Sequence, residues 1–157
     1  MRVVAAGTAA LVVLLGGTNT LAADVLRLRV PSHVAASAGQ ETVAAIQITV
    51  KRGYHVQANP VRNPSLIPIV LDMMADGSVT PGSPDYPLSK TMRLEGADED
   101  LVVYDGTFAI RLPLAVAVDA PAGPVILSGT LRYQACDDRH CLFPVTRPVK
   151  LVVQVGH

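Results

Sequence analysis

Residues 145–155 read VTRPVKLVVQV, and residues 125–135 read VILSGTLRYQA. In both segments apolar side chains recur at every second position, which is the period at which a β-strand presents one face. In residues 125–135 the side chains on one face are Leu127, Leu131 and Tyr133. In residues 145–155 they are Val149, Leu151, Val153 and Val155. The two segments therefore predict half-buried strands, separated by a short charged connection.

The same alternation extends toward the N-terminus. It predicts strands over 26–30, 44–50, 54–57, 67–73, 101–104 and 107–118, with turns at 37–40, 51–53, 105–106 and 121–124. Pro68 lies inside one of these segments and indicates an edge strand or a bulge, since proline cannot donate a ladder hydrogen bond. Residues 76–100 are polar, rich in Gly and Pro and without clear periodicity, so we expect an irregular surface loop.

The prolines and the short apolar segments between them are typical of an all-β protein. All 12 prolines lie between Pro31 and Pro148, and no convincing amphipathic helix separates the predicted strands. We therefore predict one all-β domain, an antiparallel β-sandwich of immunoglobulin-like type, with a small closed barrel as the alternative.

Charge and composition exclude several function classes. The 157 residues carry 13 basic and 13 acidic side chains, and 50% of them are hydrophobic. A balanced charge does not favour nucleic acid or an anionic membrane as a partner. Two cysteines are too few for a disulfide-rich scaffold or a four-cysteine zinc site, so they are expected to act as one pair.

The N-terminus has the features of a secretory signal peptide. Arg2 precedes an apolar run over residues 3–15, and Thr20-Leu21-Ala22 fits the small-residue rule for cleavage, here placed after Ala23. A membrane anchor is the alternative, but a span needs about 20 apolar residues. We expect residues 1–23 to be cleaved, leaving a soluble domain over 24–157 in the periplasm, an oxidising compartment.

The chemistry centres on Cys136-Asp137-Asp138-Arg139-His140-Cys141, which lies between the last two predicted strands. Two cysteines across such a hairpin tip can form a disulfide. A bridge that closes about six residues adds only about 2 kcal/mol of stability, so exchange chemistry is favoured over a structural role, which stays open. The third alternative is copper or zinc bound by both thiols and His140, with His55 or a methionine as an outside ligand.

The residues beside each cysteine suggest different roles for the two sulfurs. Arg139 and His140 adjoin Cys141 and favour a thiolate there, whereas Asp137 and Asp138 adjoin Cys136 and oppose one. Cys141 is thus the expected attacking sulfur. Among the other candidates, solvated histidines are expected at His33 and His157, and core packing at Met73-Met74.

Several motifs occur in an order that resembles the N-terminal periplasmic domain family of the thiol:disulfide interchange protein DsbD. The specific element is Tyr133-Gln134-Ala135-Cys136 with Cys141 and Pro144 downstream. Weaker elements are Gly53 to Pro60, Ser65-Leu66-Ile67-Pro68, Tyr86-Pro87 and Val103-Tyr104-Asp105-Gly106.

The resemblance implies an immunoglobulin-like sandwich with a redox-active Cys136–Cys141 pair. It also implies electron transport by thiol–disulfide exchange, from a membrane thiol-disulfide reductase through thioredoxin-like proteins to periplasmic clients, including those of cytochrome c maturation. By its place in the motif, Cys141 would form the mixed disulfides and Cys136 would resolve them. No cofactor or metal is expected. Because neither a membrane module nor a thioredoxin-like domain follows up to His157, we expect either that a separate membrane protein supplies the electrons or that the domain has another use.

The resemblance also assigns supporting residues around the pair. A cap loop with an aromatic lid would include Asp85 and Tyr86. His55 and Gln57 stand where some members have aromatic residues. His55 could exchange protons with the thiols, and a hydrogen-bonded structural histidine is the alternative. Supporting positions are also expected at Tyr133, Gln134 and His140. The chain would then be a protein-disulfide reductase component; the rival is a non-enzymatic exported module that binds a partner protein or copper, with a structural disulfide.

Overall fold

The computed structural model describes residues 25–93 and 99–156, which form three four-stranded sheets. The predicted signal peptide over 1–23 and His157 lie outside the described residues, so both remain predictions. In the part of the chain that the structure describes, no helix is long and apolar enough to cross a membrane.

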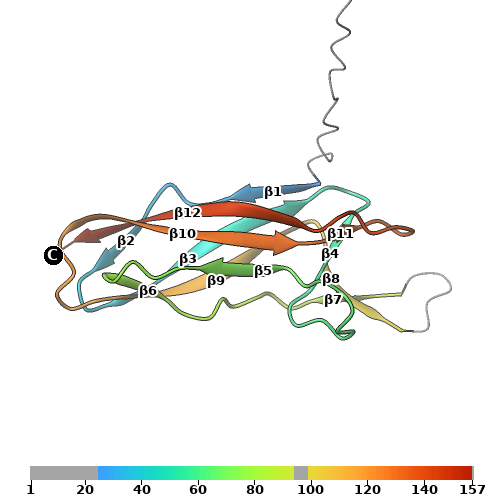
Figure 1. Cartoon of the computed structure of the whole chain (residues 1–157), viewed down its shortest axis with the longest axis horizontal. Coiled ribbons are helices and arrows are strands. Elements are labelled where there is room, and N and C mark those ends of the chain that lie inside the picture. Colours follow the sequence, from blue (N-terminus) through green and yellow to red (C-terminus); the bar gives the residue numbers. More distant parts are fainter. Residues whose placement is uncertain (1–24, 94–98, 157) are drawn as a thin grey trace, which may run out of the picture.

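Two of the sheets form the layers of a sandwich (Figure 1). The first has the order β1-β3-β9-β6 and is antiparallel throughout, with β1 (Leu26–Arg29), β3 (Glu41–Val50), β9 (Thr107–Val116) and β6 (Val79–Pro81). The second has the order β2-β12-β10-β5, with β2 (Val34–Ser37), β12 (Val145–Gly156), β10 (Gly123–Tyr133) and β5 (Val70–Met73). In this sheet β2 pairs in parallel with the end of β12, while the other pairs are antiparallel.

The predicted alternation determines which side chains form the core. Along β3, Ala44, Ile46, Ile48 and Val50 are buried while the residues between them are mostly exposed. On β10 and β12, Leu127 lies opposite Leu151 and Val125 opposite Val153, and all four are buried. Burying an aliphatic side chain of this size contributes about 1.5–3 kcal/mol. The apolar faces of the two sheets thus make one continuous core, and the all-β sandwich prediction is confirmed.

The third sheet lies at one end of the sandwich and carries the cysteines (Figure 1). Its order is β11-β4-β8-β7, with β11 (Ala135–Cys136), β4 (His55–Gln57), β8 (Leu101–Tyr104) and β7 (Lys90–Met92). The chain passes from β10 into β11 after a single residue, Gln134, so the strand of the sandwich leads directly to the first cysteine. The end sheet is therefore what positions the disulfide.

The expected irregular loop over 76–100 is wrong where β6 and β7 lie. Each is only three residues long, and in β6 only Val79 is buried, so neither is long enough to show a period of two. β2 was not predicted as a strand for the same reason. The predicted strand over 67–73 begins later in the structure, because Pro68 forms only an isolated parallel bridge with Gln57 and β5 starts at Val70. β5 itself is the edge of its sheet.

Candidate functional site

The two cysteines form a disulfide at the base of the hairpin that follows β11. Their Cα atoms lie 3.9 Å apart and the two residues face each other as an antiparallel bridge. The hairpin is closed by two backbone hydrogen bonds, in which Asp137 N–H donates to His140 C=O at 2.9 Å and Leu142 N–H donates to Ala135 C=O at 2.8 Å. The chain geometry alone therefore brings the sulfurs together.

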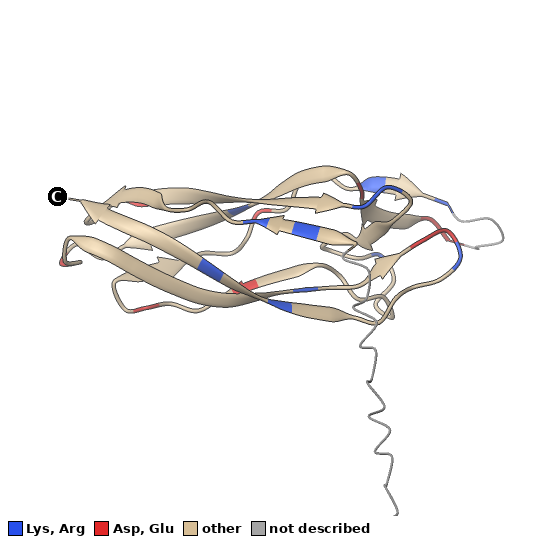
Figure 2. Cartoon of the chain, turned by 90° about the horizontal axis from the view of Figure 1, so that it is seen from above, with Lys and Arg blue, Asp and Glu red and all other residues tan. Residues whose placement is uncertain are grey.

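Asp137 holds the turn of this hairpin. Its Oδ1 accepts hydrogen bonds from the backbone N–H groups of Arg139 and His140, each at 2.7 Å. These two donors hold the pKa of the Asp137 carboxyl below its ordinary value, because they stabilise the charged form. Asp137, one of the two acidic residues expected to oppose a thiolate at Cys136, thus fixes the turn. Figure 2 shows acidic and basic positions side by side at this tip, whereas each of the four long strands carries only one or two charged residues.

The two sulfurs differ sharply in exposure. Cys136 is 2% exposed, whereas Cys141 is an exposed residue. A pocket of about 180 Å³ lies against the pair and is lined by residues of three segments besides the hairpin: His55 and Gln57 of β4, Leu66, and Leu101 of β8. An incoming thiolate can reach Cys141, while Cys136 is enclosed by the end sheet.

Two buried polar side chains lie behind Cys136. Cys136 pairs with His55 across β11 and β4, and Gln57 Nε2 donates a hydrogen bond to Cys136 Sγ at 3.9 Å. His55 is 2% exposed and Gln57 1%. In the described part of the chain, His55 Nε2 and Gln57 Oε1 are the buried side-chain nitrogen and oxygen atoms without a hydrogen-bond partner.

Burial lowers the pKa of His55 below its ordinary value of 6.5, and the carboxylates of Asp138, Asp105 and Asp137 oppose this in part. Desolvation is the largest cause because the charged imidazolium loses more hydration than the neutral ring. The imidazole is therefore neutral near neutral pH, with a ring nitrogen available for a proton. The sequence pointed to His55 through its motif, but only the fold shows that its Nε2 is buried without a partner.

Other predicted residues lie elsewhere. The Tyr86 hydroxyl accepts a hydrogen bond from Leu71 N–H at 3.0 Å and the side chain packs against the sandwich core, while Asp85 pairs through its backbone with Arg111. Neither lines the pocket around the disulfide, which Leu66 and Leu101 border instead. The lid function of Tyr86 stays a prediction.

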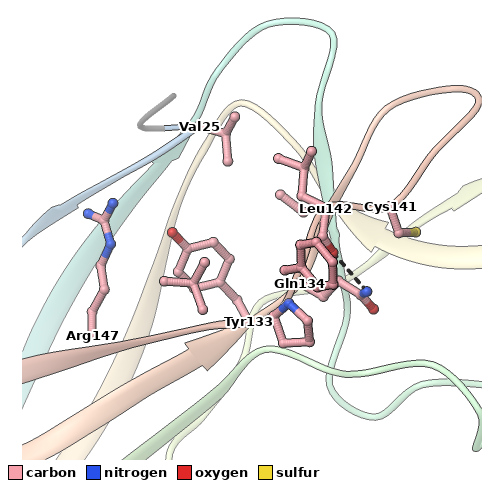
Figure 3. Close-up of a pocket in the computed structure, with 10 residues that line it drawn as sticks. Val25, Tyr133, Gln134, Cys141, Leu142 and Arg147 are labelled. Carbon is pink, nitrogen blue, oxygen red and sulfur yellow. Dashed lines mark hydrogen bonds between the residues drawn. The ribbon is translucent and has the colours of Figure 1, made fainter. Parts of the chain in front are cut away.

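Gln134 and His140 do lie at the hairpin. Gln134 Nε2 donates to Leu142 C=O at 2.9 Å, a contact that Figure 3 shows as a dashed line, and it ties the end of β10 to the residue after Cys141. His140 Nδ1 lies 4.0 Å from Asp137 Oδ1, with an exposed ring. Tyr133 is buried, and burial raises the pKa of its phenol. Among the described residues, no cluster of three or more His, Cys, Asp or Glu side chains is placed to hold a metal ion.

The fold and the hairpin define a class: an immunoglobulin-like β-sandwich that carries a cysteine pair on one end. Residues 23–153 match the sequence model of the family described as thiol:disulfide interchange protein DsbD, N-terminal, so the chain belongs to that family. No curated protein matches the sequence. Family membership and the disulfide-bonded pair support a role in thiol–disulfide exchange.

Similar solved structures include the N-terminal domains of two bacterial proteins. The N-terminal periplasmic domain of ScsB from Proteus mirabilis is 11% identical with a TM-score of 0.53, and the match covers 82% of this chain and 45% of that one. The reduced DsbD N-terminal domain of Neisseria meningitidis is 18% identical with a TM-score of 0.45, covering 72% of this chain and 78% of that one. The chain thus spans less than half of the ScsB chain, and at this identity the likeness concerns the fold alone.

Proposed function

We propose that this chain is a periplasmic thiol–disulfide exchange domain that relays electrons from a membrane reductase or a thioredoxin-like partner to periplasmic client proteins. The observation that carries the proposal is the unequal exposure of the pair: Cys136 is 2% exposed and Cys141 is open to solvent. A protein partner can attack only a sulfur that it can reach. The proposal includes export by the segment 1–23 and a mature domain from residue 24.

Reduction of the domain takes two exchanges. A partner thiolate attacks Cys141 Sγ, a new S–S bond forms, and the Cys136–Cys141 bond breaks with Cys136 leaving as a thiolate. A second thiolate of the partner then attacks the partner's own sulfur in the mixed disulfide and releases Cys141. The partner is oxidised by two electrons and the domain gains them. Reduction of a client reverses this order: Cys141 attacks the client disulfide, and Cys136 resolves the mixed disulfide.

His55 and Gln57 have complementary parts in this sequence. Gln57 Nε2 already donates to Cys136 Sγ at 3.9 Å, so the same N–H stabilises Cys136 when it leaves as a thiolate. In the resolving step Cys136 must lose its proton, and the neutral imidazole of His55, which lines the same pocket, can accept it. Cys136 and His55 are paired across β11 and β4, which holds the two groups together.

The hairpin residues position Cys141. Gln134 holds the backbone at Leu142, Asp137 fixes the turn, and Arg139 and His140 place positive charge or a polar ring beside the exposed sulfur. Positive neighbours favour a thiolate, so Cys141 is the nucleophile toward clients. Asp85 and Tyr86 would act indirectly, as part of a cap. Loss of the Tyr86 hydroxyl should then change the exchange rates.

Trapping in cells tests the roles of the two cysteines. A Cys136→Ala variant keeps the reachable sulfur and lacks the resolving one, so it should accumulate mixed disulfides that thiol reagents release. The matched Cys141→Ala variant should trap little, and the double variant gives the background. If Cys141→Ala traps and Cys136→Ala does not, the two roles are reversed.

Titration against glutathione tests the function itself. A disulfide that takes part in exchange should have a less negative reduction potential than a structural disulfide. If the purified domain stays oxidised below about −300 mV and resists thioredoxin-like reductants, the disulfide is structural and the proposal fails. A non-enzymatic module would also keep its partner after both cysteines are replaced by serine, whereas an exchange domain would lose all transfer.

A further inference from the structure

An apolar groove of about 480 Å³ lies beside Cys141. Its lining includes Val25, which precedes β1, Tyr133 at the end of β10, and Leu142 and Phe143 after Cys141. Figure 3 shows Val25 and Tyr133 on one side and Leu142 on the other. Cys141 itself lies at the edge of the groove, next to Leu142. Cys141 therefore borders both the pocket of about 180 Å³ and this larger groove.

Phe143 makes this groove unusual. Its side chain is 93% exposed, although it is among the most apolar residues of the chain, and it stands two residues after the reachable cysteine. Two other large apolar residues have comparable exposed fractions among the described residues, Leu88 at 98% and Val118 at 85%. Leu88 lines a separate hollow with Pro87 and Tyr104. An exposed apolar side chain at the border of a groove marks a surface suited to a partner.

The exchange reaction itself determines what can cover the groove. In any mixed disulfide the partner's sulfur lies about 2 Å from Cys141 Sγ. The Cα atoms of the residues adjoining the partner's cysteine lie about 4 Å from the Cα atom of that cysteine, so these residues are brought close to the neighbours of Cys141. Those neighbours are the charged tip over 137–140 on one side and the groove on the other.

The lining favours an uncharged occupant. Arg147 is the charged residue among those that line the groove, and its guanidinium carbon lies 6.0 Å from the centre of the Tyr133 ring, over apolar surface. No carboxylate lines the groove in the described part of the chain, so nothing there matches a basic segment. Apolar side chains would instead cover Phe143 and Leu142 and exclude water from both.

We propose that this groove binds apolar side chains next to the reactive cysteine of a protein partner, and thereby selects thiols with apolar flanks. The inference rests on the proposed exchange function. Small thiols, which carry no flanking residues, gain nothing from the groove and react at the intrinsic rate of the disulfide.

Peptide thiols of two kinds test the selection. The oxidised domain is mixed with a leucine-cysteine-leucine peptide, a serine-cysteine-serine peptide or 2-mercaptoethanol, and mixed-disulfide formation is followed by acid quenching and mass spectrometry. The wild-type domain should react about tenfold faster with the leucine peptide than with the serine peptide, which corresponds to about 1.4 kcal/mol. Phe143→Ser should remove most of this preference and leave the rate with 2-mercaptoethanol unchanged.

Leu88→Ser is the matched control, because Leu88 is at least as exposed as Phe143 and lies in a different hollow. It should retain the preference in full. Equal rates of the wild-type domain with both peptides, or an equal loss in the two variants, would overturn the groove proposal while the exchange function stands. If 2-mercaptoethanol fails to open the disulfide, the exchange function itself is lost.

Sedimentation of the oxidised domain decides whether a second copy of the chain occupies the groove instead. A monomer in both wild type and Phe143→Ser agrees with a groove kept open for a partner. A wild-type dimer that becomes monomeric in Phe143→Ser assigns the groove to self-association and overturns the proposal.

Discussion

The sandwich and the end sheet bury different kinds of side chain. Between the two long sheets the buried residues are apolar, and their strands are ten to twelve residues long in β3, β9, β10 and β12. The end sheet has strands of two to four residues, and the described residues that are buried and polar, His55 and Gln57, both lie in it. An unpaired buried polar atom costs about 1–3 kcal/mol.

This difference shows a division of tasks. We expect the long sheets to provide a core that folds without help from the cysteines, and such a surplus of stability would permit an end sheet with unsatisfied polar atoms beside the disulfide. A bridge needed for folding could not be opened and closed. Four changes, taken from the largest expected effect to the smallest, test how independent the two regions are.

Replacing both cysteines should abolish the chemistry of the end sheet while the sandwich still folds. The Cys136→Ser/Cys141→Ser double variant should lose all exchange, because no other sulfur pair exists in the chain. It should still fold, with a free energy of unfolding lower by about 2 kcal/mol, since the bridge closes only a short loop. Urea unfolding followed by circular dichroism measures the second quantity. An unfolded double variant would show that the sandwich depends on its disulfide.

Gly129→Ala should affect the sandwich and leave the disulfide chemistry intact. Gly129 lies opposite Met73, and an added Cβ would stand 2.2 Å from Asp72 O and 2.4 Å from Met73 Sδ. Because the first of these is backbone, β5 must shift, which should cost about 3 kcal/mol of stability. Gly156→Ala is the control, since its Cβ would meet Ala36 O at an ordinary 3.8 Å. Equal stability of the two variants would contradict the tight packing of β5 on β10.

The sequence predicted the sandwich well because long strands repeat one signal many times. In β12 the buried positions Val149, Leu151, Val153 and Val155 alternate as expected from the letters alone. The strands β2, β6 and β7 were missed, since they contain at most one buried residue each and show no apolar alternation, so pairing with a distant partner decides their structure.

The site was predicted only as far as its motif extends. The cysteines and the histidine on β4 stand within recognisable stretches, so Cys136, Cys141 and His55 were named from the sequence. Leu66 and Leu101 reach the pocket from segments about 70 and 35 residues before Cys136. Leu66 lies in a weak motif and Leu101 begins a predicted strand, but neither pattern shows that the residue lies beside the cysteines. Tyr86 is held at Leu71, a contact that depends on tertiary structure.

The third change tests the buried histidine through pH. The pKa of His55 is lowered by burial, so the unfolded chain takes up a proton near 6.5 while the folded chain does not until lower pH. The unfolded state then binds more protons, and stability should fall as pH drops from about 6.5 toward the lowered pKa. His55→Gln should flatten the dependence of stability on pH in this range. The range lies above 3.8, the ordinary pKa of the Asp137 carboxyl, so the titration of that carboxyl does not overlap with it.

The His55→Gln variant also tests the exchange step. If His55 accepts the Cys136 proton, resolution of mixed disulfides should slow as His55 becomes protonated, and His55→Gln should lower the rate and remove that pH dependence. His33→Gln, at an exposed position, retains His55 and should keep both the rate and the pH profile. A His55→Gln variant with an unchanged profile would leave His55 a structural residue only.

The smallest effect is expected on the outer surface of the end sheet. Lys90 of β7 forms an ion pair with Asp105, but its side chain is 68% exposed, so solvent and salt screen the attraction. Lys90→Gln should lower stability by about 0.5 kcal/mol, and high salt should remove the difference. Asp105 also raises the pKa of His55, so the measurement belongs at a pH well above 6.5, where the histidine is neutral in both states. A loss several times larger would mean that the end sheet depends on its surface charges, and the contrast with the apolar sandwich would then extend from the buried side chains to the surface.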